Sequence, residues 1–326
     1  MTLRSAAQGS VVAAAIVSGA AGGAQSQVRS LHVQGNVWML HSDVANAAIQ
    51  IGPDGVLVVD TMTDSLADPM LAEIRRLAPG QPIRIIVNTH VHSDHTGGNA
   101  TLGAAGRTVI GGNAVAELGR AAADRAEIYA HENVQTRMAQ PGGGAAPVPT
   151  ASWPSNTFIE SQHDLYFNGE GIELLYQGHA HTDGDTMVYF RKSDVLVAGD
   201  VYANDLFPRV DLDNGGDLAG IIKALNTIIR VTIPREKEEG GTYVIPGHGR
   251  LADEADIVEY RDMTTILRDR IADAVKRQQT LAQTQAARLT RDYEGRYGLA
   301  QGWSTSHFVE AAYKSARVAP SAAGKK

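Results

Sequence analysis

The chain has 326 residues, of which 43% are hydrophobic and 20% charged, and its formal net charge is −7. This composition is typical of a globular protein. Apart from the terminal Lys325-Lys326 pair the chain has no basic run, which disfavours nucleic acid as a partner because phosphate binding needs clustered Lys and Arg. We therefore expect a small-molecule partner. The chain has no Cys, which excludes disulfides, thiolate metal ligands and a thiol nucleophile.

The first 26 residues predict a secretion signal. Arg4 supplies a short positive start, residues 10–21 form a small apolar run, and the small residues that follow suit cleavage near 24–26. The run is too short and too rich in Gly for a permanent membrane helix. A disordered Ala-rich tail is the alternative. We expect a periplasmic or secreted protein without a stable membrane span.

Short apolar or alternating runs predict strands in the first half of the remaining chain. They cover residues 31–40, 45–51, 56–60, 83–87 and 107–110. Helical spacing predicts helices over 65–77 and 113–138. Gly and Pro then break the pattern over 141–154, which indicates either a lid or a linker.

The second half repeats this mixture of strands and helices. Strands are expected over 163–167, 172–176, 186–190, 195–198 and 243–245. Helices are expected over 218–229, 253–279 and 308–314, and the polar segment 281–297 is helix-prone. We interpret residues 27–280 as one domain of two packed sheets with helices outside, followed by a helical extension over 281–326.

Four potential metal ligands lie within six residues, directly after the apolar strand at 83–87. They are His90, His92, Asp94 and His95. Imidazole and carboxylate suit zinc and similar metals. Side chains alternate in an extended chain, so this segment can serve two neighbouring metal positions. A polar loop that is rich in His by chance is the alternative.

Three later segments place further ligand types just after predicted strands, each beside Gly. They contain His179 and His181, then Asp200, then His248. Loops at strand ends of a rigid scaffold are where such sites are usually assembled. The adjacent Gly residues allow sharp turns and keep bulk away from a metal.

Over residues 31–266 the chain resembles the metallo-β-lactamase superfamily. The resemblance rests on the HxHxDH segment at 90–95, a GxxHTxGD-like segment at 178–185, Gly199-Asp200 and the PGHG at 246–249. It implies an α/β (α+β) fold, a four-layer αβ/βα sandwich, with the site at one sheet edge. It also implies two Zn²⁺ ions per chain, with iron or manganese as possible replacements.

The resemblance assigns the ligands by position. His90, His92 and His181 would bind the first metal, Asp94, His95 and His248 the second, and Asp200 would bridge both. The family pattern has its ligand directly before Thr, which favours His181 over His179. His179 would then support a ligand or line the cavity.

Two divalent metals can share a hydroxide, since they lower the pKa of bound water toward about 7. Asp94 is the candidate catalytic residue, because it could orient that hydroxide and pass its proton to the leaving atom. Asp60, at the end of a buried strand, could orient a metal-bound His; a plain strand-end turn acid is the alternative. Thr182 or Asn99 could support ligands or a developing oxyanion.

The resemblance implies an exported dinuclear zinc hydrolase acting on a β-lactam, a lactone or another ester. One group of zinc β-lactamases has Cys where this chain has Asp200, and the aspartate resembles members that cleave thioesters, lactones and other esters. Phe207 could pack on a substrate ring and Arg209 could hold a carboxylate; ordinary loop packing with a solvated Arg is the alternative. A di-iron redox protein, a non-catalytic metal-binding module and a nuclease are the other readings.

Overall fold

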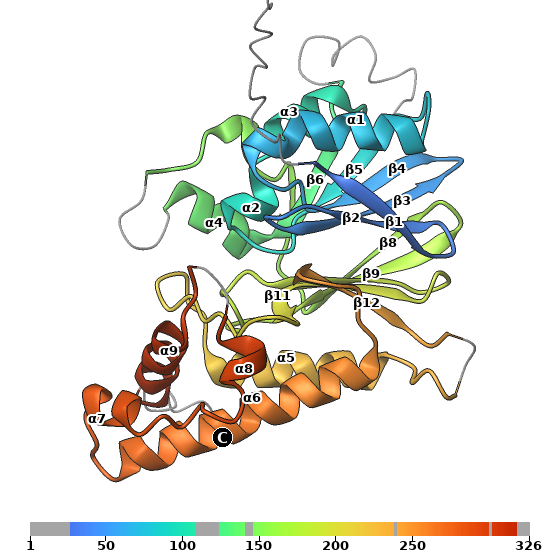
Figure 1. The fold of residues 1–326 in the computed structure, drawn as a ribbon. Helices are drawn as coiled ribbons and strands as arrows, with labels where there is room; N and C mark the ends of the chain where they lie inside the picture. The colour runs from blue at the N-terminus through green and yellow to red at the C-terminus, as the bar shows by residue number, and fades with distance from the viewer. Residues whose placement is uncertain (1–26, 109–123, 141–145, 238–239, 300–301, 318–326) are drawn as a thin grey trace, which may run out of the picture.

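The structure is a computed structural model, in which residues 27–108, 124–140, 146–237, 240–299 and 302–317 are described. Two sheets pack face to face and helices cover both outer faces (Figure 1). Helices α1 (Ala67–Leu77) and α3 (Asn99–Ala105) lie outside the first sheet, and α5 (Leu218–Val231) and α6 (Glu254–Lys276) lie outside the second. The four-layer sandwich predicted from the sequence is confirmed.

The first sheet has seven strands in chain order. They are β1 (Arg29–Gln34), β2 (Val37–His41), β3 (Asn46–Gly52), β4 (Gly55–Val59), β5 (Ile83–Val87), β6 (Glu127–His131) and β7 (Asn156–Phe158). Neighbours are antiparallel from β1 to β4 and parallel from β4 to β7. Parallel β4 and β5 end at the same edge, which is where the His-rich segment begins.

Two expectations for this sheet were wrong. Residues 31–40 form a hairpin instead of one strand, because Gly35 takes a φ of 58° and turns the chain between β1 and β2. A helix was expected over 113–138. In the described part of that range, helix begins only at residue 132, in α4 (Glu132–Ala139). Residues 127–131 instead form β6, which is hydrogen-bonded between β5 and β7. Sheet pairing outweighs the helix propensity of this Ala-containing stretch. The strand expected over 107–110 falls partly outside the described residues, and residues 107–108 are not in a strand.

The second sheet has the order β12-β11-β10-β9-β8. Its strands are β8 (Gln162–Phe167), β9 (Glu170–Tyr176), β10 (Thr186–Phe190), β11 (Val195–Ala203) and β12 (Tyr243–His248). Only the β11–β12 pair is parallel. β11 and β12 run further than expected, so Asp200 and His248 lie within the ends of these strands. Apolar side chains of both sheets, such as Val59, Val87 and Val197, fill the space between them.

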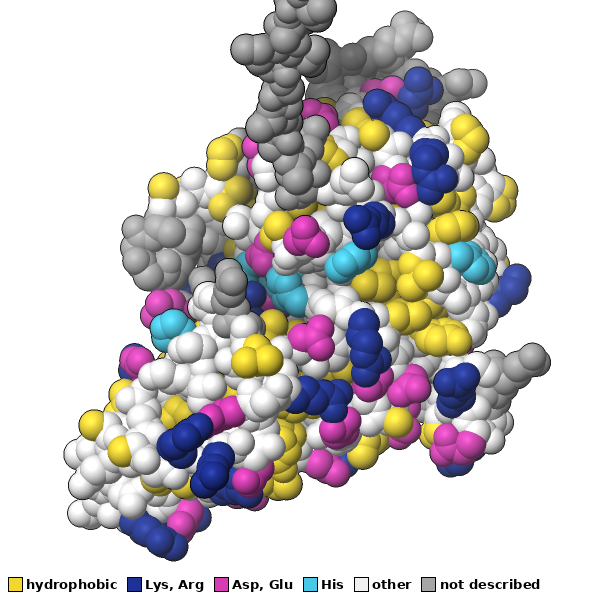
Figure 2. Space-filling view, in the orientation of Figure 1, with side chains coloured by type: hydrophobic (Ala, Val, Ile, Leu, Met, Phe, Trp, Pro, Cys, Tyr) yellow, Lys and Arg dark blue, Asp and Glu magenta, His cyan; other side chains and the backbone are white. Residues whose placement is uncertain are grey.

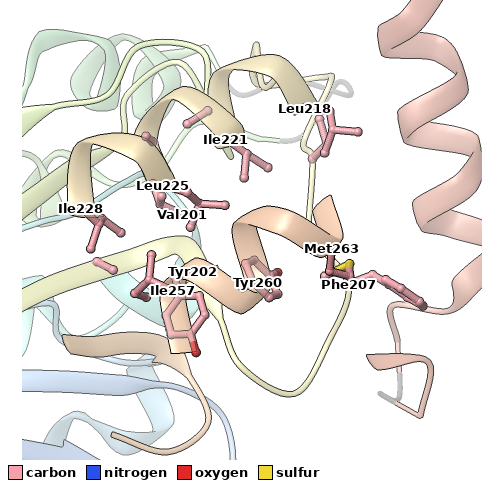
Figure 3. Packing of buried hydrophobic residues seen from close by; sticks show 14 of the residues in the cluster. Val201, Tyr202, Phe207, Leu218, Ile221, Leu225, Ile228, Ile257, Tyr260 and Met263 are labelled. Atoms are coloured by element: carbon pink, nitrogen blue, oxygen red, sulfur yellow. The ribbon is translucent and has the colours of Figure 1, made fainter. Parts of the chain in front are cut away.

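Three more helices follow α6. They are α7 (Leu281–Ala286), α8 (Glu294–Tyr297) and α9 (Thr305–Arg317). The buried face of α9, which includes Phe308 and Ala312, joins the same hydrophobic cluster as α5 and α6. Figure 3 shows part of this cluster, including Phe207 from the loop after β11 and Met263 of α6. The domain boundary at residue 280 stays a prediction.

The surface carries both signs of charge. On the face drawn in Figure 2, acidic and basic side chains are interspersed over the lower helices. Several are paired along α6 and α8, as in Arg296 with Glu259 and Arg270 with Asp292. Among the described helices, none has the length and apolar character needed to cross a membrane.

Candidate metal centre

Four segments that are distant in sequence bring their ligand-type side chains together at one end of the sandwich. The side chains form two adjoining groups: His90, His92, His181 and Asp200, and Asp94, His95 and His248. Within each group, all ligand atoms lie within 4.8 Å of one another. The structure therefore assembles all seven predicted ligand side chains at one place.

Asp200 faces both groups. Its Oδ1 lies 3.2 Å from His95 Nε2 and 3.2 Å from His248 Nε2, while its Oδ2 lies 3.5 Å from His181 Nε2. The carboxylate thus offers one oxygen to each group.

Gly residues make room for this carboxylate. Gly199 has a φ of 53° at a register shift between β11 and β12, which turns the next residue toward the site. A Cβ on Gly247 would lie only 2.1 Å from Asp200 Oδ1. Any larger residue at this position would displace the carboxylate, so the glycine in PGHG protects the position of Asp200.

Several buried polar atoms at the centre make no hydrogen bond to a described residue, although they lie within ion-pair distance of one another. Within the described chain, both carboxylate oxygens of Asp200 and the Nε2 atoms of His95 and His248 make no hydrogen bond. Buried polar groups are normally paired, and unpaired ones need an explanation. A set of imidazole and carboxylate donors that converge without partners fits a divalent metal pair.

Asp60 orients His95. Its Oδ2 accepts a hydrogen bond from His95 Nδ1 at 2.7 Å, and the carboxylate also accepts from the N–H and hydroxyl of Thr89. Asp60 has a φ of 63°, an unusual conformation for a residue other than Gly. Because Nδ1 of His95 is held by Asp60, Nε2 of His95 is directed at the centre. This is the orienting role predicted for Asp60.

Two histidines of the first group are held by the loop after β11, through groups that the sequence did not single out. His92 Nε2 donates to Asp211 Oδ2 at 2.7 Å, and His181 Nδ1 donates to the carbonyl of Arg209 at 2.8 Å. The loop after β11 therefore fixes both rings. The only sequence signal for Asp211 was its place in the turn-rich segment 211–216, soon after Asp200.

Burial and charge set the protonation of the centre. Burial lowers the pKa of His181 to about 4 and that of His90 well below its usual value. Burial also opposes the charged forms of His95 and Asp200, but their charged neighbours have the larger effect. Asp200 and Asp60 raise the pKa of His95 well above its usual value. His248 and His95 lower the pKa of Asp200 well below its usual value. Two imidazoles are thus neutral and ready to bind a metal, while His95 and Asp200 form a charged pair.

The geometry bears on three further expectations, those for His179, Asn99 and Thr182. His179 is exposed, bonds to the carbonyl of Gly215 and belongs to neither ligand group. Asn99 forms hydrogen bonds with Thr61 and Asn88. Thr182 donates hydrogen bonds to Asp185, and burial raises the pKa of Asp185 to about 8. Both residues therefore stabilise the segments around them.

For Phe207 the structure supports ordinary packing, the alternative to a substrate contact. Its side chain is fully buried and stacks on Phe308 of α9 with ring centroids 4.9 Å apart. Arg209, in contrast, is partly exposed, and its guanidinium lies 3.7 Å from Asp200 Oδ2 beside a cavity.

The sequence profile of the metallo-beta-lactamase superfamily matches residues 42–249. The chain belongs to this superfamily. Proteins of this superfamily are metal-dependent hydrolases. The four metal motifs on which the resemblance was based all fall inside the matched segment.

Individual relatives of the chain are distant. The chain is 26% identical over 169 residues to the 2,4-dinitroanisole O-demethylase subunit alpha of Nocardioides sp. (strain JS1661), a match covering 52% of this chain and 44% of the relative. The structure of the sec-alkylsulfatase Pisa1 from Pseudomonas sp. aligns with a TM-score of 0.62 at 18% identity, over 89% of this chain and 50% of that one. A metallo-beta-lactamase from Pontibacter korlensis aligns with a TM-score of 0.51 at 19% identity, over 73% and 99%. The chain thus spans half or less of the first two relatives, and the structural matches show a shared fold.

Proposed function

We propose that the protein is an exported dinuclear zinc hydrolase that cleaves an ester-type or amide bond. The observation that carries this proposal is the position of Asp200, whose two oxygens make no hydrogen bond within the described chain and face two groups of histidines. In this proposal His90, His92 and His181 hold the first metal, Asp94, His95 and His248 hold the second, and Asp200 is shared. When bound, such a metal pair supplies hydroxide at neutral pH and polarises the scissile carbonyl.

Asp94 is the proposed proton carrier. Its Oδ2 lies 3.5 Å from His248 Nε2 and 3.9 Å from His95 Nε2, and its side chain is 23% exposed. The carboxylate is therefore beside the second group and still open to solvent, which lets it accept a proton and release it to a leaving atom.

Arg209 is the proposed anchor for an anionic group on the substrate. Its side chain is 35% exposed, and it contacts Asp200 at 3.7 Å without a bidentate geometry. A guanidinium in this position can bind a carboxylate through two parallel hydrogen bonds. Lactones and other esters are the favoured substrates, because an aspartate occupies position 200; a β-lactam is the further candidate.

Chelation tests the proposal. Purified protein is stripped of metal, reloaded separately with zinc, manganese or iron, and assayed against β-lactams, lactones, thioesters and simple esters. We expect hydrolysis to disappear with the metal and to return best with zinc. Unchanged hydrolysis by the stripped protein would overturn the proposal, as would activity only in redox assays of the iron form.

Export is a separate part of the proposal. The predicted signal over residues 1–26 lies outside the described residues. When the full chain is expressed in a host with a secretion pathway, we expect the exported protein to begin near residue 25 or 27. Accumulation in the cytosol with residue 2 or Met1 still at the terminus would overturn this part.

A further inference from the structure

A cavity of about 430 Å³ opens beside the first ligand group. One side is lined by His92, His181 and Arg209, and the opposite side by Trp303 and residues of α9. The segment that matches the superfamily ends at residue 249, so this opposite wall comes from a part of the chain outside that match. The volume of this cavity lies within the range of clefts that bind small organic molecules.

The α9 wall is held rigidly against the cavity. Phe308 and Ala312 are buried in the hydrophobic cluster of α5 and α6, and Phe308 stacks on Phe207. At the other end of the helix, the Ser315 hydroxyl bonds to the Asp217 carboxylate and accepts from the N–H of Leu218. Because one face of α9 is buried in this way, the opposite face is presented to the cavity.

The residues on that opposite face are spaced one helical turn apart. His307, Glu310 and Lys314 all line the cavity. Lys314 Nζ lies 2.7 Å from Glu310 Oε1, so the charges at this end of the wall offset each other. The wall therefore carries little net charge, in contrast to Arg209 beside the ligand group.

Two rings form the centre of the wall. The centroids of Trp303 and His307 are 5.9 Å apart, with the ring planes inclined by 33°. The indole N–H of Trp303 is buried and makes no hydrogen bond to any described residue, although an indole N–H usually finds a partner. Nearby, Val210 and Leu212 add apolar lining. The cavity is thus polar beside His92 and His181 and aromatic along the C-terminal segment.

We propose that Trp303 and His307 bind the aromatic ring of the substrate, so that the protein favours esters carrying an aryl group over small aliphatic esters. The preference for aryl esters rests on the proposed hydrolase function, whereas binding of an aromatic ring by Trp303 and His307 does not. Ring contacts of this kind contribute on the order of a three- to tenfold change in affinity.

Paired substrates test the proposal. Phenyl butyrate and methyl butyrate share an acyl group and differ in the ring. We expect Trp303→Ala and His307→Ala to raise KM for the phenyl ester roughly three- to tenfold, to leave the methyl ester within about twofold, and Trp303→Phe to restore most of the loss. Equal effects on the two esters would overturn the proposal.

The chain offers a matched control. Trp38 and His32 form another Trp–His contact, with centroids 4.8 Å apart, and neither lines this cavity. Trp38→Phe and His32→Ala are expected to leave the preference between the two esters unchanged. A similar loss of preference in these variants would show that the effect is not specific to the α9 wall and would overturn the proposal.

Binding is also measurable without turnover. The chain has three Trp residues, so the double variant Trp38→Phe/Trp153→Phe leaves Trp303 as the sole indole fluorophore. Titration with phenylacetate should quench its fluorescence saturably, and acetate should not. Absence of quenching would overturn the aromatic wall. Quenching in a zinc-loaded protein that hydrolyses neither esters nor β-lactams would refute the hydrolase function and leave the aromatic binding by Trp303 standing.

Discussion

Asp211 and His92 are joined by a 2.7 Å hydrogen bond across 119 residues of chain. The carboxylate is fixed in turn by Asn214, whose side chain and backbone N–H both donate to it. Burial alone would raise the pKa of Asp211, but the hydrogen bonds from His92 and Asn214 lower it. Asp211 is therefore charged at neutral pH and holds His92 Nε2, which leaves Nδ1 for the candidate metal centre.

Asp211→Asn should weaken the first metal selectively. Loss of a carboxylate that orients a metal-bound His typically costs about 10- to 100-fold in affinity. Competition with a chromophoric chelator measures the affinity for each of the two metals. Asp213→Asn is the matched control, because Asp213 lies on the same loop but its carboxylate does not bond to His92. Equal affinity in the two variants would contradict the role of Asp211.

Asp60→Asn should weaken the second metal instead. The amide keeps the size of the side chain, but it loses the charge that holds Nδ1 of His95. We again expect about 10- to 100-fold weaker binding, now at the group formed by His95, Asp94 and His248. A crossed pattern between Asp60→Asn and Asp211→Asn supports two distinct metal positions. If both variants lose the same metal, the assignment of ligands to two groups is wrong.

Phe207→Ala should destabilise the whole domain. Phe207 is fully buried between Phe308 and Tyr297, so truncation leaves a cavity that costs about 3–5 kcal/mol. The free energy of unfolding, from urea titration of the metal-free protein, measures this. Phe207→Leu should cost less, because it fills more of the space. A stable Phe207→Ala protein with selective loss of aromatic substrates would instead restore the substrate role expected from the sequence.

Metal binding should release a proton near pH 6. His95 has a raised pKa, so its contribution to stability is present below its unfolded value of about 6.5 and lost as pH rises through the higher folded value. Asp200 has a lowered pKa, so its contribution persists above about pH 3.9 and is lost only at lower pH. Within that window a metal must displace the proton of His95.

Calorimetry in buffers of different ionisation enthalpy counts these protons. We expect close to one proton per chain to be released with the second metal near pH 6, and fewer as the pH rises. His90 and His181 are already neutral because burial lowers their pKa, so the first metal should release less from this pair. Proton release that is the same at pH 6 and pH 10 would contradict the charged His95–Asp200 pair.

The sequence was sufficient to predict which seven side chains converge, because each belongs to a short motif at the end of an apolar strand. The fold class followed from the same order of strands and motifs. Contacts made by irregular segments could not be predicted in this way. Asp211 lies in a loop without a motif, and only the folded chain brings it to His92.

Long-range packing explains the other differences. Phe207 follows a ligand-bearing strand, which suggested a site residue, but helices about a hundred residues later in the chain bury it. Residues 127–131 follow an Ala-rich stretch that led to a helix prediction, but they pair with β5 and β7 as a strand. Neither result is encoded in the local pattern, because both depend on which distant segments pack nearby.

The most direct test of the central claim is the metal content of the Asp200→Asn variant, measured by native mass spectrometry after zinc loading. The account predicts two zinc ions per wild-type chain and the loss of both, measured at equal free zinc, when the shared carboxylate is removed. A wild-type chain that holds one zinc, or a variant that keeps one of two, would contradict a centre built around Asp200.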